Sequence, residues 1–180
     1  MHSNVINKKG DLITSAVTNL DLHDMARAAK TFGVRKFYIV TPLEDQKTLV
    51  KQITSHWITG VGGELNPSRK EALELISVKD SMAQVKEDIF ARENDSVKVV
   101  ATTARKCSYS TSFGKLRQIL DKKSSPVLLT FGTAWGLSEQ FISNVDYVLE
   151  PIAGCAGYNH LSVRSAASII LYKLLGGMDS

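Results

Sequence analysis

Short apolar runs alternate with longer segments in which apolar residues recur at helical spacing. The helical spacing predicts helices over residues 21–32, 46–59, 69–73, 80–93, 113–120 and 161–172. The apolar runs predict strands over residues 11–18, 36–40, 97–101, 127–131 and 147–150. Residues 73–78 fit either a continued helix or a strand. Because strands alternate with helices, the expected fold class is α/β, with a mostly parallel sheet and helices on both of its faces.

Punctuating residues set the expected ends of these elements. Asn19 or Asp21 can cap the first helix, and Gly33 follows its last apolar position. Pro42 stops the strand over 36–40, because proline has no N–H for a sheet ladder. The glycines of residues 60–63 break the second helical pattern, and Asn66 and Pro67 are typical of a new helix start.

Composition narrows the class of protein. A length of 180 residues suits a single domain spanning 1–180, and 43% hydrophobic with 22% charged residues is ordinary for a globular chain. No apolar run approaches the roughly 20 residues of a membrane span, and the first residues do not resemble a secretory signal. Cys107 and Cys155 have neither a disulfide framework nor metal-ligand spacing, so we expect a cytoplasmic protein without a metal. The net charge of +4 suits RNA binding without requiring it.

Two glycine-rich turns in the last third each follow an apolar strand. The first is Gly-Thr-Ala-Trp-Gly-Leu-Ser at 132–138, and the second runs from Pro151 to His160. Glycine lets main chain approach a ligand closely, and ligands of open α/β sheets bind beyond the carboxyl ends of the strands. No Lys-Ser/Thr pair follows the first turn, so it is not a phosphate-binding P-loop. One pocket walled largely by main chain is the expectation.

Polar and basic residues near these turns supply candidate chemistry. Asn159, His160 and Ser162 stand before a helix and can cap it. Arg164 lies in the first helical turn, where a cation opposes the helix dipole, so we expect it to have a partner. That partner is either an internal carboxylate or a substrate group, and the sequence favours neither. Arg105 and Lys106 follow a strand end and suit a phosphate.

The two turns together resemble the SPOUT superfamily of S-adenosylmethionine-dependent RNA methyltransferases. The second motif of that family, a strand followed by Gly-Ser/Thr and then Gly-Leu-Ser, is similar to residues 131–138. Its third motif is similar to residues 160–164, and its first to Arg27 followed by Phe32-Gly33-Val34. Two departures are visible: Ala134 and Trp135 stand in a shortened loop without the family's Glu, and His160 stands where Asn is common. The methylated atom is therefore open.

The resemblance implies a bound S-adenosylmethionine, an RNA substrate, a homodimer and a C-terminal trefoil knot. It places the cofactor on Thr102, Thr130, Phe131, Gly132, Thr133, Gly136, Leu137, Pro151, Ile152, Gly157, Tyr158, Asn159, Leu161 and Ser162. The catalytic residues it implies are Arg27, Asp24, Arg164 and His160. The residues it implies for RNA are Arg27, Arg105, Lys106 and Arg164. A Cβ at Gly132 is expected to enter the cofactor pocket.

Several alternatives remain open on the sequence alone. The proton acceptor is Asp24, His160 or Glu150, in no firm order. The apolar face of the last helix, residues 163, 166, 170 and 174, is either a dimer seam or the core side of the helix. One rival function is a cofactor-binding RNA-interaction protein without transferase activity. Another is an unrelated doubly wound α/β nucleotide enzyme, which lacks the knot.

Overall fold

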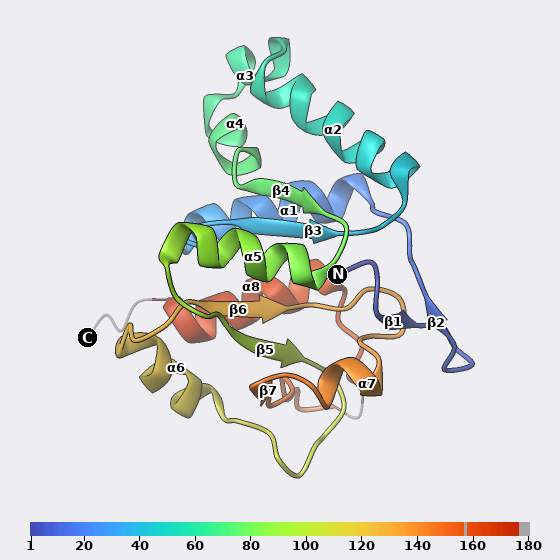
Figure 1. Ribbon diagram of the computed structural model, residues 1–180, viewed down its shortest axis with the longest axis vertical. Coiled ribbons are helices and arrows are strands. Elements are labelled where there is room, and N and C mark those ends of the chain that lie inside the picture. The colour runs from blue at the N-terminus through green and yellow to red at the C-terminus, as the bar shows by residue number, and fades with distance from the viewer. Residues whose placement is uncertain (157, 177–180) are drawn as a thin grey trace.

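The parallel strands form two adjacent sheets in the computed structural model, which describes residues 1–156 and 158–176 (Figure 1). In one sheet, β3 pairs with β4; in the other, the order is β6-β5-β7, and all of these pairs are parallel. The strands are β3 (Phe37–Val40), β4 (Ile76–Lys79), β5 (Lys98–Thr102), β6 (Val127–Thr130) and β7 (Tyr147–Leu149). The prediction of a parallel α/β fold is confirmed.

Helices cover both faces of the β3-β4 sheet, because successive side chains of a strand point to opposite faces. The helices are α1 (Asn19–Thr31), α2 (Glu44–Ile58), α3 (Val61–Leu65), α4 (Pro67–Leu73), α5 (Met82–Glu93), α6 (Phe113–Asp121), α7 (Glu139–Ile142) and α8 (Val163–Leu175). Ile39 packs with Leu22 of α1 and Val50 of α2. Its neighbour Val40 packs with Val85 of α5 on the other face.

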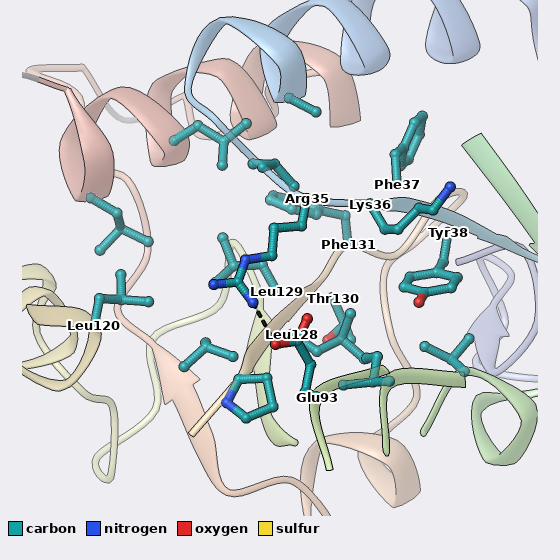
Figure 2. A pocket seen from close by; sticks show the side chains of 18 of the residues that line it. Arg35, Lys36, Phe37, Tyr38, Glu93, Leu120, Leu128, Leu129, Thr130 and Phe131 are labelled. Atoms are coloured by element: carbon teal, nitrogen blue, oxygen red, sulfur yellow. Dashed lines mark hydrogen bonds and ion pairs between the residues drawn. The ribbon is translucent and has the colours of Figure 1, made fainter. Parts of the chain in front are cut away.

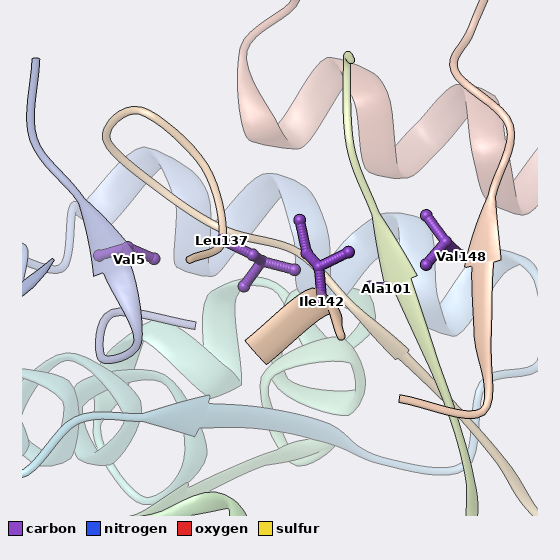
Figure 3. Packing of buried hydrophobic residues seen from close by; sticks show 5 residues of the cluster. All are labelled: Val5, Ala101, Leu137, Ile142 and Val148. Carbon is purple, nitrogen blue, oxygen red and sulfur yellow. The ribbon is translucent and has the colours of Figure 1, made fainter. Parts of the chain in front are cut away.

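The β6-β5-β7 sheet is covered in the same way. Val100 packs with Leu116 of α6 and with Ile170 of α8 on one face. On the other face, Ala101 packs against α7 and the N-terminal segment in a cluster of five buried residues (Figure 3). The members of that cluster are Val5, Ala101, Leu137, Ile142 and Val148.

The burial of α8 decides between the two interpretations of its apolar face. Ile170 and Leu174 are each 4% exposed and pack in the core against Val100 and Leu149. The stripe of apolar residues predicted from the sequence is therefore the core side of the helix. At these two positions the stripe is buried within the chain, while Val163 and Ala166 are partly exposed.

Two local predictions differ from the structure, and one open alternative is decided. The expected strand 11–18 shrinks to β2 (Leu12–Ile13), which pairs antiparallel with an unpredicted strand β1 (Val5–Ile6). Thr18 caps α1 in place of Asn19 or Asp21, since its hydroxyl accepts the Asp21 N–H at 3.2 Å. The ambiguous stretch 73–78 ends α4 and then begins β4. Gly33 lies just after α1 with a φ of 68°, a conformation that suits glycine.

In the described part of the chain, none of the helices has the length and apolar character of a membrane span.

Candidate functional site

The carboxyl ends of β5, β6 and β7 lie at one edge of their sheet, and three segments leave from that edge. Thr102 donates its hydroxyl to the Thr130 carbonyl at 2.9 Å, which joins the ends of β5 and β6. Asn159 donates its amide to the Ala104 carbonyl at 3.0 Å, which joins the second glycine turn to the segment after β5. Arg105 donates to the Leu137 carbonyl at 3.2 Å, which joins the first turn to the same segment. The two predicted turns thus meet at one edge.

The first turn folds back tightly on itself. Gly136 has a φ of 95° and donates its N–H to the Thr133 carbonyl at 3.0 Å. A Cβ added at Gly132 would lie 2.6 Å from the Leu137 nitrogen and 2.8 Å from the Gly136 carbonyl carbon. Such a Cβ would therefore meet the main chain of the turn itself, and its entry into the cofactor pocket stays a prediction. Gly132 is needed because the chain returns against its own main chain.

The N-terminal segment around residues 4–6 pairs with this turn, which the sequence did not predict. The Trp135 N–H donates to the Ile6 carbonyl at 3.1 Å, and the Ile6 N–H donates to the Gly136 carbonyl at the same distance. The Ser138 N–H donates to the Asn4 carbonyl at 2.9 Å. These main-chain groups are bonded within the chain, so they shape the turn and are not free donors for a ligand. A two-residue strand is too short to show a period, so only its pairing reveals it.

Several predicted cofactor residues have structural partners of their own. The Thr133 hydroxyl lies 2.5 Å from the Ser15 hydroxyl. The Thr130 hydroxyl is buried and donates to the Val100 carbonyl at 2.9 Å, so it holds β6 to β5. Leu137 is 1% exposed and belongs to the core. These residues support the site from behind rather than line it.

The second turn is largely exposed. Tyr158 and His160 lie edge to face with ring centroids 5.3 Å apart, while Pro151 and Ile152 are half-buried. Ser162 caps α8 by accepting the Ser165 N–H at 3.3 Å. Gly157, which we predict to contact the cofactor, lies outside the described residues.

Glu150 has a structural role that tells against it as the proton acceptor. Its carboxylate accepts the Phe113 N–H at 2.7 Å, at the start of α6. An anion at this position is stabilised by the helix dipole as well as by the hydrogen bond. Glu150 therefore anchors α6 to the end of β7.

Arg164 has the internal partner that its place in the first turn of α8 calls for. Its guanidinium lies 3.3 Å from the Asp21 carboxylate and 3.4 Å from the Asp24 carboxylate, both on α1. The Asp21 side chain is 12% exposed, whereas that of Asp24 is 46% exposed. Arg27 is exposed and lies three residues after Asp24, so it stands on the same side of α1. Three of the four predicted catalytic residues therefore gather here, and His160 lies apart in the second turn.

The basic pair after β5 divides between two environments. Arg105 forms an ion pair with Glu139 of α7, in addition to its bond to Leu137. Lys106 is exposed beside it. Within residues 1–156 and 158–176, no three His, Cys, Asp or Glu side chains lie together in a way that could hold a metal ion.

The exposed parts of the two turns carry apolar side chains and open main chain. Trp135, Tyr158 and Leu161 are 59%, 75% and 47% exposed, and they offer apolar surface for an adenine ring. A Cβ at Gly154 would meet no atom within 4 Å, so the main chain there is open to close approach.

Known proteins agree with this class of fold, a parallel α/β domain. The profile of a family described as SAM-dependent RNA methyltransferase matches residues 1–176. The chain therefore belongs to this family, and the predicted resemblance and cofactor are confirmed at that level. An unrelated doubly wound nucleotide enzyme is excluded.

Relatives and solved structures extend the comparison. The tRNA (guanine-N(1)-)-methyltransferase of Oleidesulfovibrio alaskensis is 42% identical over 98% of this chain and 41% of its own length. An uncharacterized protein of Aquifex aeolicus is 34% identical over 97% of this chain and 85% of its own. The chain thus spans about two fifths of the first relative. TrmJ from Z. mobilis ZM4 has a TM-score of 0.60 at 18% identity, covering 88% of this chain and 64% of that one, and shares the fold. The SpoU methyltransferase AviRb from Streptomyces viridochromogenes, solved with AdoMet, has a TM-score of 0.55 at 20% identity, over 89% of this chain and 54% of that one.

Proposed function

We propose that this protein transfers the methyl group of S-adenosylmethionine to a nucleoside of tRNA. Family membership supports the reaction class, and two relatives named tRNA (guanine-N(1)-)-methyltransferase, at 42% and 40% identity, support tRNA as the substrate. The observation that carries the proposal is the group formed by Asp24, Arg164 and Arg27 at the meeting of α1 and α8. A carboxylate and two cations side by side suit proton removal and phosphate binding.

The cofactor, when bound, supplies an electrophilic methyl group on a sulfonium. In the proposed site the exposed apolar surface of Trp135, Tyr158 and Leu161 holds its adenine, and the main chain near Gly154 lies against it. Holding donor and acceptor in line contributes several kcal/mol, since oriented groups reach effective molarities of about 10⁵–10⁸ M.

The two carboxylates beside Arg164 have different tasks in this proposal. Asp21 is nearly buried and keeps the guanidinium in place. Asp24 is about half exposed, so it can reach an acceptor atom and remove its proton. Arg164 and Arg27 then hold an RNA phosphate or base edge, and Lys106 adds a phosphate contact. Arg105 joins them when an RNA phosphate displaces Glu139.

Four further features belong to the proposal. The chain forms one domain, and its C-terminal segment forms the trefoil knot of the SPOUT fold. It acts in the cytoplasm, where tRNA is found. It forms a homodimer, in which a second copy covers Leu20, 60% exposed and next in the chain to Asp21 of the Asp21–Arg164 pair. Sedimentation at micromolar concentration tests the dimer, and a monomer mass contradicts it.

Calorimetric titration with S-adenosylmethionine, followed by transfer of a labelled methyl group to tRNA, tests the function. Asp24→Asn is expected to lower turnover about 10²–10⁴-fold with cofactor affinity unchanged, as for loss of a general base. Glu87→Gln is the matched control, because Glu87 is an exposed carboxylate on α5, at the opposite face of the β3-β4 sheet. Full activity in Asp24→Asn refutes the assigned role, and cofactor binding without transfer to any tRNA favours an RNA-interaction protein without transferase activity.

A further inference from the structure

A cavity of about 680 Å³ separates the two sheets (Figure 2). It lies between β3 and β6, and both strands line it along their length. In the described part of the chain, β3 is paired with β4 alone and β6 with β5 alone. Two parallel strands therefore present unpaired edges to the same cavity, and unpaired main-chain groups away from water are costly.

The hydrogen-bond pattern identifies the groups that face the cavity. Along a strand of a parallel sheet, the groups of alternate residues point to alternate sides. The Phe37 and Thr41 N–H groups donate to β4 and the residues flanking it, at 2.9 and 3.0 Å. Those of Tyr38 and Val40 accordingly point into the cavity. On the other wall, the Lys98 N–H of β5 donates to the Pro126 carbonyl at 2.8 Å, so the main-chain groups of even-numbered residues of β6 face β5. The main-chain groups of its odd-numbered residues, Leu129 among them, therefore point into the cavity.

The first two residues of the chain already bond to both walls. The Met1 amino group donates to the Phe131 carbonyl at 2.5 Å, and the Thr133 N–H donates to the Met1 carbonyl at 3.3 Å. His2 turns to the opposite wall and donates its N–H to the Val40 carbonyl at 3.0 Å. One residue bonded on one side and the next on the other is the pattern of an interior strand of a parallel sheet.

We propose that the cavity between β3 and β6 is the seat of a further parallel strand, an extended apolar segment joined to the nitrogen of Met1. Such a strand joins the two sheets into one. Its length matches the four residues of β3, and continuing backwards from Met1 it runs parallel to both walls. It pairs in turn with the free groups of Phe131, Val40, Leu129 and Tyr38. The side chains above and below the slot, such as Ala29, Val85, Ile89 and Leu171, are apolar, as a strand buried on both faces requires.

The surroundings of the Met1 nitrogen support a covalent continuation over a separate ligand. Burial lowers the pKa of the Met1 amino group to about 5, so a charged amine is poorly accommodated there. An amide N–H donates the same bond to Phe131 without a charge to desolvate.

Extension of the chain tests the inference. Val-Leu-Val-Leu placed directly before Met1 is expected to raise the melting temperature by at least about 5 °C, since each kcal/mol shifts it by about 2–4 °C in a domain of this size. Hydrogen exchange at the Val40 and Phe131 amides is expected to slow at least about tenfold. The matched control is Val-Pro-Leu-Pro, of similar length and apolar character, which cannot complete the ladder because proline has no N–H.

Each outcome of this experiment is informative. Unchanged melting and exchange in the extended chain overturn the inference, as does equal stabilisation by the proline control. In the unextended chain, the Tyr38 and Val40 amides are expected to exchange faster than those of Phe37 and Ile39. Equally slow exchange in a monomer refutes the open slot, and equally slow exchange in a dimer shows that a second copy fills it. None of these measurements depends on methyl transfer.

Discussion

A single added methyl group at Gly132 tests how the first glycine turn is built. The Cβ of Gly132→Ala would lie 2.6 Å from the Leu137 nitrogen, whereas ordinary contacts begin at 3.4 Å. Main chain cannot swing aside as a side chain can, so the turn must open by about 0.8 Å. Overpacking of this kind costs about 1–3 kcal/mol. At about 2–4 °C for each kcal/mol, the melting temperature falls by about 2–12 °C.

Two other glycines provide graded controls for the same assay. Gly136→Ala meets no atom within 4 Å but has a φ of 95°, so it carries only backbone strain of about 1–3 kcal/mol. Gly154→Ala meets no atom and is not at a positive φ, so its melting temperature stays near that of the parent. Scanning calorimetry with and without S-adenosylmethionine measures all three. Equal melting of Gly132→Ala and Gly154→Ala would refute the reasoning.

The remaining predictions concern charge. Arg164→Ala leaves the nearly buried Asp21 without its cation, so thermal melting should show a loss of about 1–3 kcal/mol in stability. RNA titrations at two salt concentrations should show a shallower salt dependence of RNA affinity. Undiminished RNA binding would contradict a role of Arg164 in holding RNA. Hydrogen bonds from Lys79 and then Tyr38 lower the pKa of Asp88 to about 2, so this stabilisation is present above about pH 4 and is lost as the pH falls towards 2. Urea unfolding of Asp88→Asn should therefore depend less on pH across that window. Burial lowers the pKa of His2 to about 4, so as the pH falls the unfolded chain binds a proton at this side chain before the folded chain does. The free energy of unfolding of the parent should therefore decrease as the pH is lowered from about 6.5 to about 4, and it should decrease less in His2→Gln.

Hydrophobic spacing and capping residues predicted most of the helices and strands, because each such pattern lies within a few consecutive residues. The helical spacing of residues 80–93 and the Asn66-Pro67 start of α4 needed no knowledge of the rest of the chain. Burial on one face of α8 was visible as a stripe. What that stripe packs against was not, because a period does not name its partner, and the core residues Val100 and Leu149 lie in other strands.

The candidate site was predictable as a place and not as a set of contacts. Glycine turns after strands indicated the carboxyl edge correctly. The partner of Arg164 is Asp21, 143 residues earlier, and no spacing rule connects the two. The sequence made Glu150 a candidate proton acceptor, but its hydrogen bond from the start of α6 gives it a structural role. Polar residues near a site are thus ambiguous until their hydrogen-bond partners are known.

The pairing of residues 1–6 with the first glycine turn has a consequence for the order of folding. The bond from Met1 to Phe131 joins residues 130 apart, so this part of the site is among the most non-local in the chain. Contacts of such separation form late, since the loop between them must be closed first. During synthesis the N-terminal segment emerges first and lacks its partner in the glycine turn until that turn has left the ribosome. A substitution at Val5 or Ile6 should therefore delay assembly of the site long after the helices around it have formed.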